Sequence, residues 1–214
     1  MKPILFSYWR SSCSFRVRIG LALKEIDYEY RAVTGDTIDS EEYFKLNPSK
    51  KVPTLCIDDD VFTQSGAILE YLDETKPEIP LLPSDPKLRA KVRAFCMIIG
   101  ADIQPLQNIA VVEDIADLVE ESKRKETKEK WVNYWMLRGF TALEASLKKY
   151  SGKYSFGDEI TLADVFLYPQ VVNAQIYQVN LSAYPNIKRV SEGLADHPAF
   201  IAAHPNNMPD CPQP

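Results

Sequence analysis

Apolar and polar positions alternate with two different periods over the first third of the chain. Two short apolar runs, Ile4 to Trp9 and Tyr28 to Val33, have the length and composition of strands. Apolar residues between them recur at helical spacing: Phe15, Ile19, Ala22, Leu23 and Ile26. A strand, a helix and a strand in this order predict a βαβ unit with a parallel strand pair. Val17 and Leu21 lie off the apolar face, so we expect a second layer beyond this helix.

The pattern changes after residue 33. Residues 34–47 are polar and acidic, which predicts a loop with a short helix. The next apolar run begins at Pro53, and a strand tolerates proline only at an edge, at its first residue or in a turn, sometimes with a cis bond. Three aspartates then predict a tight turn, with Val61 to Thr63 as the partner strand of an antiparallel hairpin. Ser65 is predicted to cap the next helix, so the order is βαβ followed by ββα.

A proline-rich stretch divides the chain. Four prolines between Lys76 and Pro86 cannot continue a helix, and they predict a linker at a domain boundary. We therefore expect an α/β domain over residues 1–82. Residues 83–214 are expected to form an all-helical domain, because no convincing strand pattern follows the linker.

Three features organise the helical part. Pro105 is expected to bend or interrupt a long apolar stripe. Residues 114–130 are rich in Glu and Lys and are expected to form a solvated helical turn region. Thr161 and Asp164 have the spacing of a capping box, with Asp in place of the usual Glu, and they predict the start of a buried helix.

Composition and charge exclude several functions. The 214 residues carry 25 Lys and Arg against 30 Asp and Glu, and the net charge of −5 argues against nucleic acid and anionic membranes as partners. No apolar run approaches the ~20 residues of a membrane span. No signal peptide is visible at the start, so we expect a cytoplasmic protein. The four cysteines are widely spaced and the two histidines each precede a proline, so we predict no metal site.

The stretch Ser11-Ser12-Cys13-Ser14 is the clearest candidate for chemistry. It stands where the first predicted strand gives way to a helix, so unpaired backbone N–H groups and the positive end of the helix dipole favour an anion there. A thiolate is such an anion, whether it belongs to Cys13 or to a bound thiol. Arg16 stands three residues after Cys13, where a dithiol motif would need a second cysteine, which disfavours dithiol exchange.

Several motifs together resemble one protein family. They are Ser11-Ser12-Cys13-Ser14 with Arg16-Val17-Arg18-Ile19, Leu46-Asn47-Pro48, Lys51-Val52-Pro53-Thr54-Leu55, Gln64-Ser65, Ile103-Gln104-Pro105-Leu106-Gln107-Asn108 and Gly157-Asp158-Glu159. Over nearly its whole length the chain resembles the cytosolic glutathione transferases, most closely their zeta class, which includes maleylacetoacetate isomerases. The resemblance implies an N-terminal thioredoxin-like βαβ-ββα domain, followed by an all-helical C-terminal domain that holds the electrophile site.

The resemblance also implies glutathione as the cofactor and gives roles to particular residues. Ser11, Ser12 and Cys13 would form the catalytic turn, with a serine hydroxyl favouring the glutathione thiolate. The expected glutathione-binding residues are Arg16, Val52, Pro53, Gln64, Ser65, Gln104 and Asn108. Among them, Val52 would pair through its backbone with the glutathione peptide, and Gln64 and Ser65 would bind the γ-glutamyl carboxylate. Arg10 and Arg16 are candidates for a substrate carboxylate.

The implied reaction is a cis–trans isomerisation. Glutathione would add to the double bond of maleylacetoacetate, and rotation and elimination would give fumarylacetoacetate. The zeta pattern often has an arginine where this chain has Ile176, which puts the dicarboxylate substrate in question. General glutathione conjugation of haloacids or other electrophiles is therefore an alternative, and the second partner is expected to be a small electrophilic or unsaturated acid. A non-catalytic binding module on the same fold and a thioltransferase that uses Cys13 are further alternatives, and the fold implies a homodimer.

The candidate residues also have purely structural interpretations. The two serines, and likewise Gln64-Ser65, could serve only as helix caps, and Cys13 could be a packed residue. One of Arg16 and Arg18 could be a simple surface charge. Between the two serines, we favour Ser11 as the donor to the thiolate.

Overall fold

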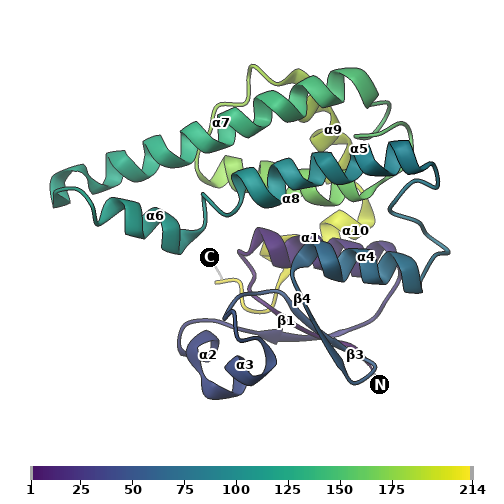
Figure 1. Cartoon of the computed structure of the whole chain (residues 1–214), viewed down its shortest axis with the longest axis horizontal. Coiled ribbons are helices and arrows are strands. Elements are labelled where there is room, and N and C mark those ends of the chain that lie inside the picture. The colour runs from purple at the N-terminus through teal and green to yellow at the C-terminus, as the bar shows by residue number, and fades with distance from the viewer. Residues whose placement is uncertain (1, 213–214) are drawn as a thin grey trace. The chain divides into compact units, whose positions relative to one another are not determined.

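The chain forms two compact units in the computed structural model, which describes residues 2–212 (Figure 1). The sheet unit comprises residues 1–81 and 195–214, and the helical unit comprises residues 82–194. The first division falls inside the proline-rich linker. Residues 195–214, which the sequence placed in the helical domain, group instead with the sheet unit, because hydrogen bonds tie them to the start of the chain.

A four-stranded mixed sheet is the centre of the sheet unit. Its strands are β1 (Ile4–Ser7), β2 (Glu29–Ala32), β3 (Thr54–Ile57) and β4 (Asp60–Thr63), in the order β2-β1-β3-β4. β1 and β2 pair in parallel, as the βαβ prediction requires. β3 pairs antiparallel with both β1 and β4, which confirms the predicted hairpin.

Helix α1 (Ser12–Leu23) connects β1 to β2 and is buried on both sides. Its buried apolar residues come from the predicted face and from the opposite one: Phe15, Val17, Ile19 and Leu21. Two other helices of the sheet unit, α4 (Ser65–Thr75) and α10 (Pro198–Ala202), both contact α1. Figure 1 shows α1 and α4 side by side over one face of the sheet. Gly20 permits this approach, because a Cβ there would lie 2.1 Å from Leu69 Cδ2.

Two short helices occupy the segment predicted as a loop with one short helix. They are α2 (Asp36–Asp39) and α3 (Glu41–Leu46). Ser40 separates them and caps α3, because its hydroxyl accepts a hydrogen bond from the backbone N–H of Tyr43 at 3.1 Å. The segment brings Tyr43 and Asn47 into hydrogen-bonding contact with the first residue of β3.

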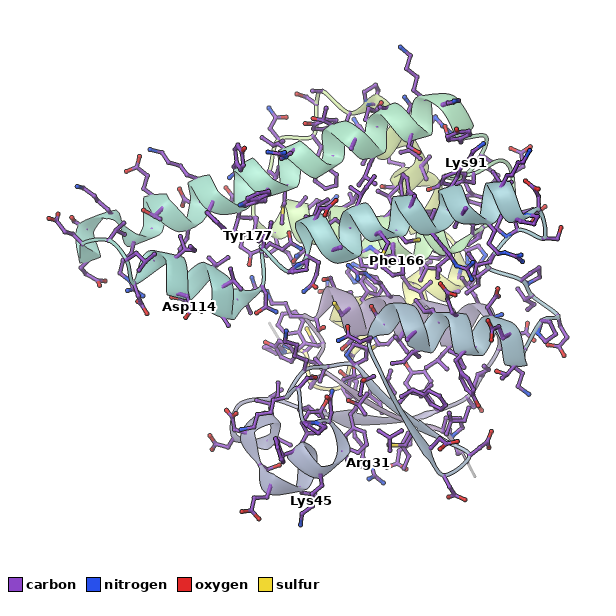
Figure 2. The ribbon with its side chains drawn as sticks, viewed as in Figure 1. Arg31, Lys45, Lys91, Asp114, Phe166 and Tyr177 are labelled. Atoms are coloured by element: carbon purple, nitrogen blue, oxygen red, sulfur yellow. The ribbon has the colours of Figure 1, made fainter. Side chains whose placement is uncertain are left out.

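The helical unit contains helices and no strand among its described residues, as the sequence predicted. Its elements are α5 (Pro86–Met97), the π-helix η1 (Ile98–Ile103), α6 (Ile109–Ala116), the 3-10 helix η2 (Glu121–Lys123), α7 (Arg124–Tyr150), α8 (Leu162–Ile176) and α9 (Pro185–Ala195). The predicted interruption occurs at Pro105, which lies in the turn between η1 and α6. Figure 2 shows Phe166 of α8 in the interior of this unit and Asp114 of α6 at its surface.

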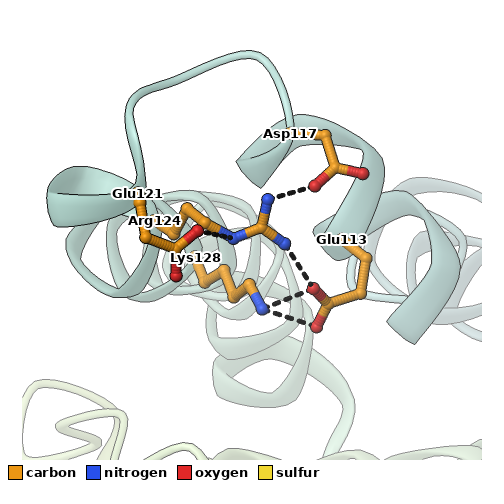
Figure 3. Close-up of polar contacts among 5 residues, drawn as sticks. All are labelled: Glu113, Asp117, Glu121, Arg124 and Lys128. Atoms are coloured by element: carbon orange, nitrogen blue, oxygen red, sulfur yellow. Dashed lines mark hydrogen bonds and ion pairs between the residues drawn. The ribbon is translucent and has the colours of Figure 1, made fainter.

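Helix α7 begins at Arg124, inside the stretch predicted as a solvated turn region. Arg124 and Lys128 form ion pairs with three acidic residues that precede them: Glu113, Asp117 and Glu121 (Figure 3). Lys128 Nζ lies 2.5 Å from Glu113 Oε2. The Glu- and Lys-rich composition thus reflects ion pairs that link α6 to the start of a long helix. Because these pairs are partly exposed to solvent, each contributes little by itself.

The predicted capping box begins α8. Asp164 is completely buried, and its carboxylate accepts hydrogen bonds from the backbone N–H groups of Thr161 and Ser155, each at 2.8 Å. Burial raises the pKa of Asp164, and the hydrogen bonds act in the opposite direction. The box therefore fixes the helix start and also ties the preceding loop to α8.

Candidate functional site

The turn between β1 and α1 presents the predicted catalytic residues at a helix N-terminus. The backbone N–H of Ser11 donates to the Tyr8 carbonyl at 3.0 Å, and the Ser11 hydroxyl accepts the N–H of Ser14 at 3.1 Å. Ser11 is therefore the N-cap, as the structural interpretation expected. The N–H groups of Ser12 and Cys13 occupy the first two helical positions, which have no acceptor within a helix. The turn is thus suited to an anion.

The capping hydrogen bond leaves the Ser11 hydroxyl able to donate a second hydrogen bond. A hydroxyl group can accept one hydrogen bond while donating its own hydrogen to another atom. Ser11 uses only an acceptor position for the cap, so its hydrogen is available for an anion at the same helix end. The side chains of Ser11, Ser12 and Cys13 are all partly exposed, whereas Ser14 is buried. The cap and the thiolate-donor interpretations of Ser11 are therefore compatible.

Arg16 connects this turn to a second helix N-terminus. Its side chain is 1% exposed, and Nη1 donates both to Cys13 Sγ at 3.8 Å and to Ser65 Oγ at 3.4 Å. Arg18 on the same helix is also fully buried. The expectation that one of the two arginines is a surface charge is therefore wrong, because both guanidinium groups find acceptors inside the unit.

The N-terminus of α4 differs by one residue from the prediction. Gln64 is the N-cap, with φ of 67°, and Ser65 is the first helical residue. Gln64 makes no side-chain capping hydrogen bond and is exposed, whereas Ser65 is buried next to Arg16. The positive φ of Gln64 turns the chain from β4 into α4, and the first N–H groups of this helix have no side-chain cap.

The Val52–Pro53 peptide bond is cis and precedes β3. The Lys51 carbonyl accepts hydrogen bonds from the Tyr43 hydroxyl and from Asn47 Nδ2, both at 2.7 Å. Pairing of β3 with β1 starts only at Thr54, so the backbone of Val52 lies ahead of the ladder. Its N–H and C=O are therefore at the end of the sheet, where an extended peptide could pair with them.

Sequence reasoning missed the residues that support this segment. The hydroxyl of Tyr43 and Nδ2 of Asn47 also lie 2.9 Å and 3.0 Å from Thr54 Oγ1, so they hold the chain on both sides of Pro53. Burial raises the pKa of Tyr43, which keeps its hydroxyl protonated and able to donate. Leu46-Asn47-Pro48 was the only signal in the sequence for this support.

Two predicted residues belong to the helical unit. Gln104 follows η1 and Asn108 caps α6, where its side chain accepts the N–H of Ala110 at 3.1 Å. They stand at the two ends of a turn and not one turn apart on a continuous helix. A buried amide pair supports this turn, because Gln107 and Gln170 each donate to the other's carbonyl oxygen at 3.0 Å.

The remaining predicted positions are more exposed. Arg10 is exposed in the turn before Ser11. Ile176 is the last residue of α8 and is 42% exposed, so an apolar side chain stands at that surface. Among residues 2–212, no three His, Cys, Asp or Glu side chains group as metal ligands would, and no helix is long and apolar enough to cross a membrane. Each of the four cysteines is a free thiol.

Both halves of the sequence match family models. Residues 10–75 match the N-terminal domain of glutathione S-transferases, and residues 111–204 match the C-terminal domain. A maleylacetoacetate isomerase from Dictyostelium discoideum is 49% identical, over 98% of this chain and 96% of that protein.

Solved structures give the same result. The holo structure of a maleyl pyruvate isomerase, a bacterial glutathione S-transferase of the zeta class, is 39% identical with a TM-score of 0.92, covering 98% of this chain and 100% of that one. A maleylacetoacetate isomerase from Anaeromyxobacter dehalogenans 2CP-1 with glutathione in its active site is 40% identical with a TM-score of 0.87, covering 99% of this chain and 98% of that one. Another structure of that protein holds dicarboxyethyl glutathione and citrate in the active site. The chain therefore belongs to the glutathione S-transferase family, within the zeta class that includes the maleylacetoacetate isomerases.

Proposed function

We propose that the chain binds glutathione and uses it to isomerise maleylacetoacetate to fumarylacetoacetate. One observation carries the proposal. Arg16 donates hydrogen bonds to Cys13 and Ser65, so the turn expected to hold the thiol and the helix end expected to hold the γ-glutamyl carboxylate belong to one connected site. The relatives add support, because one binds glutathione and a derivative of it in its active site.

The donor groups of the sheet unit fit glutathione. The hydroxyl hydrogen of Ser11 and the N–H groups of Ser12 and Cys13 would stabilise the thiolate. The buried guanidinium of Arg16 adds positive charge beside the same helix end. Val52 would offer backbone groups to the peptide, next to Pro53.

When bound, glutathione supplies a thiolate that adds to the cis double bond and leaves after rotation about the resulting single bond. The chain's part is to keep the sulfur ionised beside Ser11 and to orient the substrate. Gln64 and Ser65 would bind the γ-glutamyl end at the N-terminus of α4. Arg10 would bind a substrate carboxylate. Gln104 and Asn108 of the helical unit stay predicted glutathione-binding residues.

The test compares Ser11→Ala, Ser12→Ala and Cys13→Ala with the unaltered protein. Each is assayed for retention on immobilised glutathione and for glutathione-dependent isomerisation of maleylacetone. Removing the hydroxyl that donates to the thiolate is expected to lower kcat about 10²-fold, the usual cost of losing one donor to an anion in an active site. We expect this loss in Ser11→Ala and a smaller one in the other two variants.

Ser11→Gly is the matched control, because glycine at an N-cap costs only a few tenths of a kcal/mol and has no side-chain donor. Full activity in Ser11→Gly would show that Ser11 is only a cap. Absence of both retention and turnover in the unaltered protein would overturn the proposal and favour a binding module. A thioltransferase would be favoured instead by a glutathione-dependent reduction of disulfides that Cys13→Ala abolishes.

Conjugation of haloacids is a second candidate, favoured by the exposed Ile176 at the end of α8. An apolar side chain cannot pair with a second carboxylate, so a monocarboxylic electrophile would lose nothing there. Comparing kcat/KM for maleylacetoacetate, which carries two carboxylates, with that for a 2-haloacid, which carries one, decides between the two substrate classes.

We also propose that the protein is a cytoplasmic homodimer. Its four free thiols suit a reducing compartment. Sedimentation equilibrium tests the dimer, since a monomer mass at micromolar concentration would contradict it.

A further inference from the structure

Asp210, near the end of the chain, contacts the turn that precedes the catalytic residues. Its Oδ2 accepts the backbone N–H of Trp9 at 3.0 Å, and its Oδ1 accepts the Tyr30 hydroxyl at 2.6 Å. Burial and the hydrogen bond to Asp210 raise the pKa of Tyr30, so its hydroxyl stays a donor. One carboxylate therefore joins the C-terminal segment, strand β2 and the catalytic turn.

Arg18 holds the same turn from inside α1. Its Nη1 donates to the Tyr8 carbonyl at 3.3 Å and its Nη2 to the Trp9 carbonyl at 3.1 Å. Its Nε donates to the carbonyl of Ala203, directly after α10, at 2.9 Å. Burial lowers the pKa of Arg18 to about 10, so the group remains charged at neutral pH. A buried charge is tolerable only when its donors are satisfied, and these carbonyls satisfy them.

The two contacts act on the atoms that place Ser11. The Tyr8 carbonyl accepts hydrogen bonds from both Arg18 and the backbone N–H of Ser11. The N–H of Trp9 is fixed by Asp210, and its carbonyl by Arg18. The peptide units on both sides of Trp9 are therefore held in place. They fix the position of Ser11, which lies two residues further along the same turn. A misplacement of about 1 Å in a site of this kind can cost 10²-fold in rate.

We propose that Asp210 and Arg18 are positioning residues of the thiolate site, and that the segment from Ala203 to Asp210 completes this site. The inference rests on the proposed function, because it assigns the segment to the reaction of that site. The C-terminal segment thus acts on the sulfur through the Tyr8–Ser11 turn.

The test compares Asp210→Ala with Asp196→Ala, a matched control that removes an exposed carboxylate before α10. We measure kcat, KM for glutathione, and the pH at which the bound thiol ionises, from the ultraviolet absorbance of the thiolate. Asp210→Ala is expected to lower kcat roughly tenfold and to raise the ionisation pH, with KM within about twofold, because only the sulfur's surroundings move. Asp196→Ala is expected to behave like the unaltered protein.

Two milder variants refine the result and replace Asp210→Ala if that variant does not fold. Asp210→Asn keeps an oxygen for the Trp9 N–H and should restore most of kcat. Tyr30→Phe removes one of the two partners of Asp210 and should lower kcat by less, in the same direction. The inference would be overturned if kcat and the pH of thiol ionisation were unchanged in both Asp210→Ala and Tyr30→Phe. If Asp210→Ala does not fold, unchanged values in Tyr30→Phe alone would overturn it. Either result would leave the proposed function intact.

Amide hydrogen exchange separates the two claims. If the unaltered protein has no glutathione-dependent turnover, the proposed function fails. The exchange rates of the Trp9 and Ser11 amides still report whether the contacts of Asp210 fix the Tyr8–Ser11 turn. Faster exchange at these amides in Asp210→Ala than in Asp196→Ala would support the hold. Equal exchange would overturn it.

Discussion

Replacing Asp164 by alanine is expected to destabilise the helical unit strongly. The side chain is completely buried, and its two carboxylate oxygens accept the backbone N–H groups of Ser155 and Thr161 at 2.8 Å. The Thr161 hydroxyl adds a third contact at 3.1 Å. Alanine removes all three acceptor contacts and leaves the two N–H groups in a region that water does not reach.

The magnitude follows from counting the stranded donors. A buried donor that loses its acceptor costs about 1–3 kcal/mol, so two N–H groups give a loss of about 2–6 kcal/mol. A typical domain has only about 5–15 kcal/mol of net stability. The helical unit of Asp164→Ala is therefore expected to unfold at a much lower urea concentration, or not to fold at all.

Asp158→Ala is the matched control. Asp158 makes the same kind of contact in the same loop, because its Oδ1 accepts the Lys153 N–H at 2.8 Å, but it is exposed. Water can replace that acceptor, so the expected loss is about 0.5 kcal/mol or less.

Equilibrium urea unfolding provides the assay, followed by tryptophan fluorescence in a Trp9→Phe background. The two remaining tryptophans, Trp131 and Trp135, both lie in α7 and report on the helical unit. Equal losses in Asp164→Ala and Asp158→Ala would refute the reasoning, because they would mean that burial of the donors does not set the cost.

Two further predictions concern buried polar groups. Gln170→Leu is expected to lower the free energy of unfolding in urea by about 1–3 kcal/mol, because it leaves the buried amide of Gln107 without its partner. Adding Gln107→Leu should recover part of this loss. A further loss in the double variant would contradict the prediction. Burial, and then the charge of Arg18, lower the pKa of His204 from its ordinary value of 6.5, so the unfolded chain binds the proton more readily. The free energy of unfolding should therefore fall as the pH drops below about 6.5. His204→Asn keeps a capping acceptor and should reduce this pH dependence. An unchanged pH profile of stability in His204→Asn would contradict the prediction.

Local patterns in the sequence determined much of this protein. The strands, the helix after Ser11, the proline linker and the capping box at Asp164 all depend on residues close in sequence, whose spacing sets the backbone conformation. The same holds for the position of the predicted catalytic turn, because a helix N-terminus and its cap are features of four or five neighbouring residues. Residues 114–130, expected to form a solvated helical turn region, contain the end of α6, the 3-10 helix η2 and the start of α7, and their ion pairs with α6 were not visible in the local pattern.

Tertiary structure alone decided how the candidate site is held together. Arg16 reaches Ser65 across 49 residues, Arg18 reaches Ala203 across 185, and Asp210 reaches Trp9 across 201. No periodicity or motif records such contacts, because the partners become neighbours only after the sheet and its helices have packed. For the same reason the sequence did not indicate that residues 195–212 group with the sheet unit, because their hydrogen-bond partners lie at the other end of the chain.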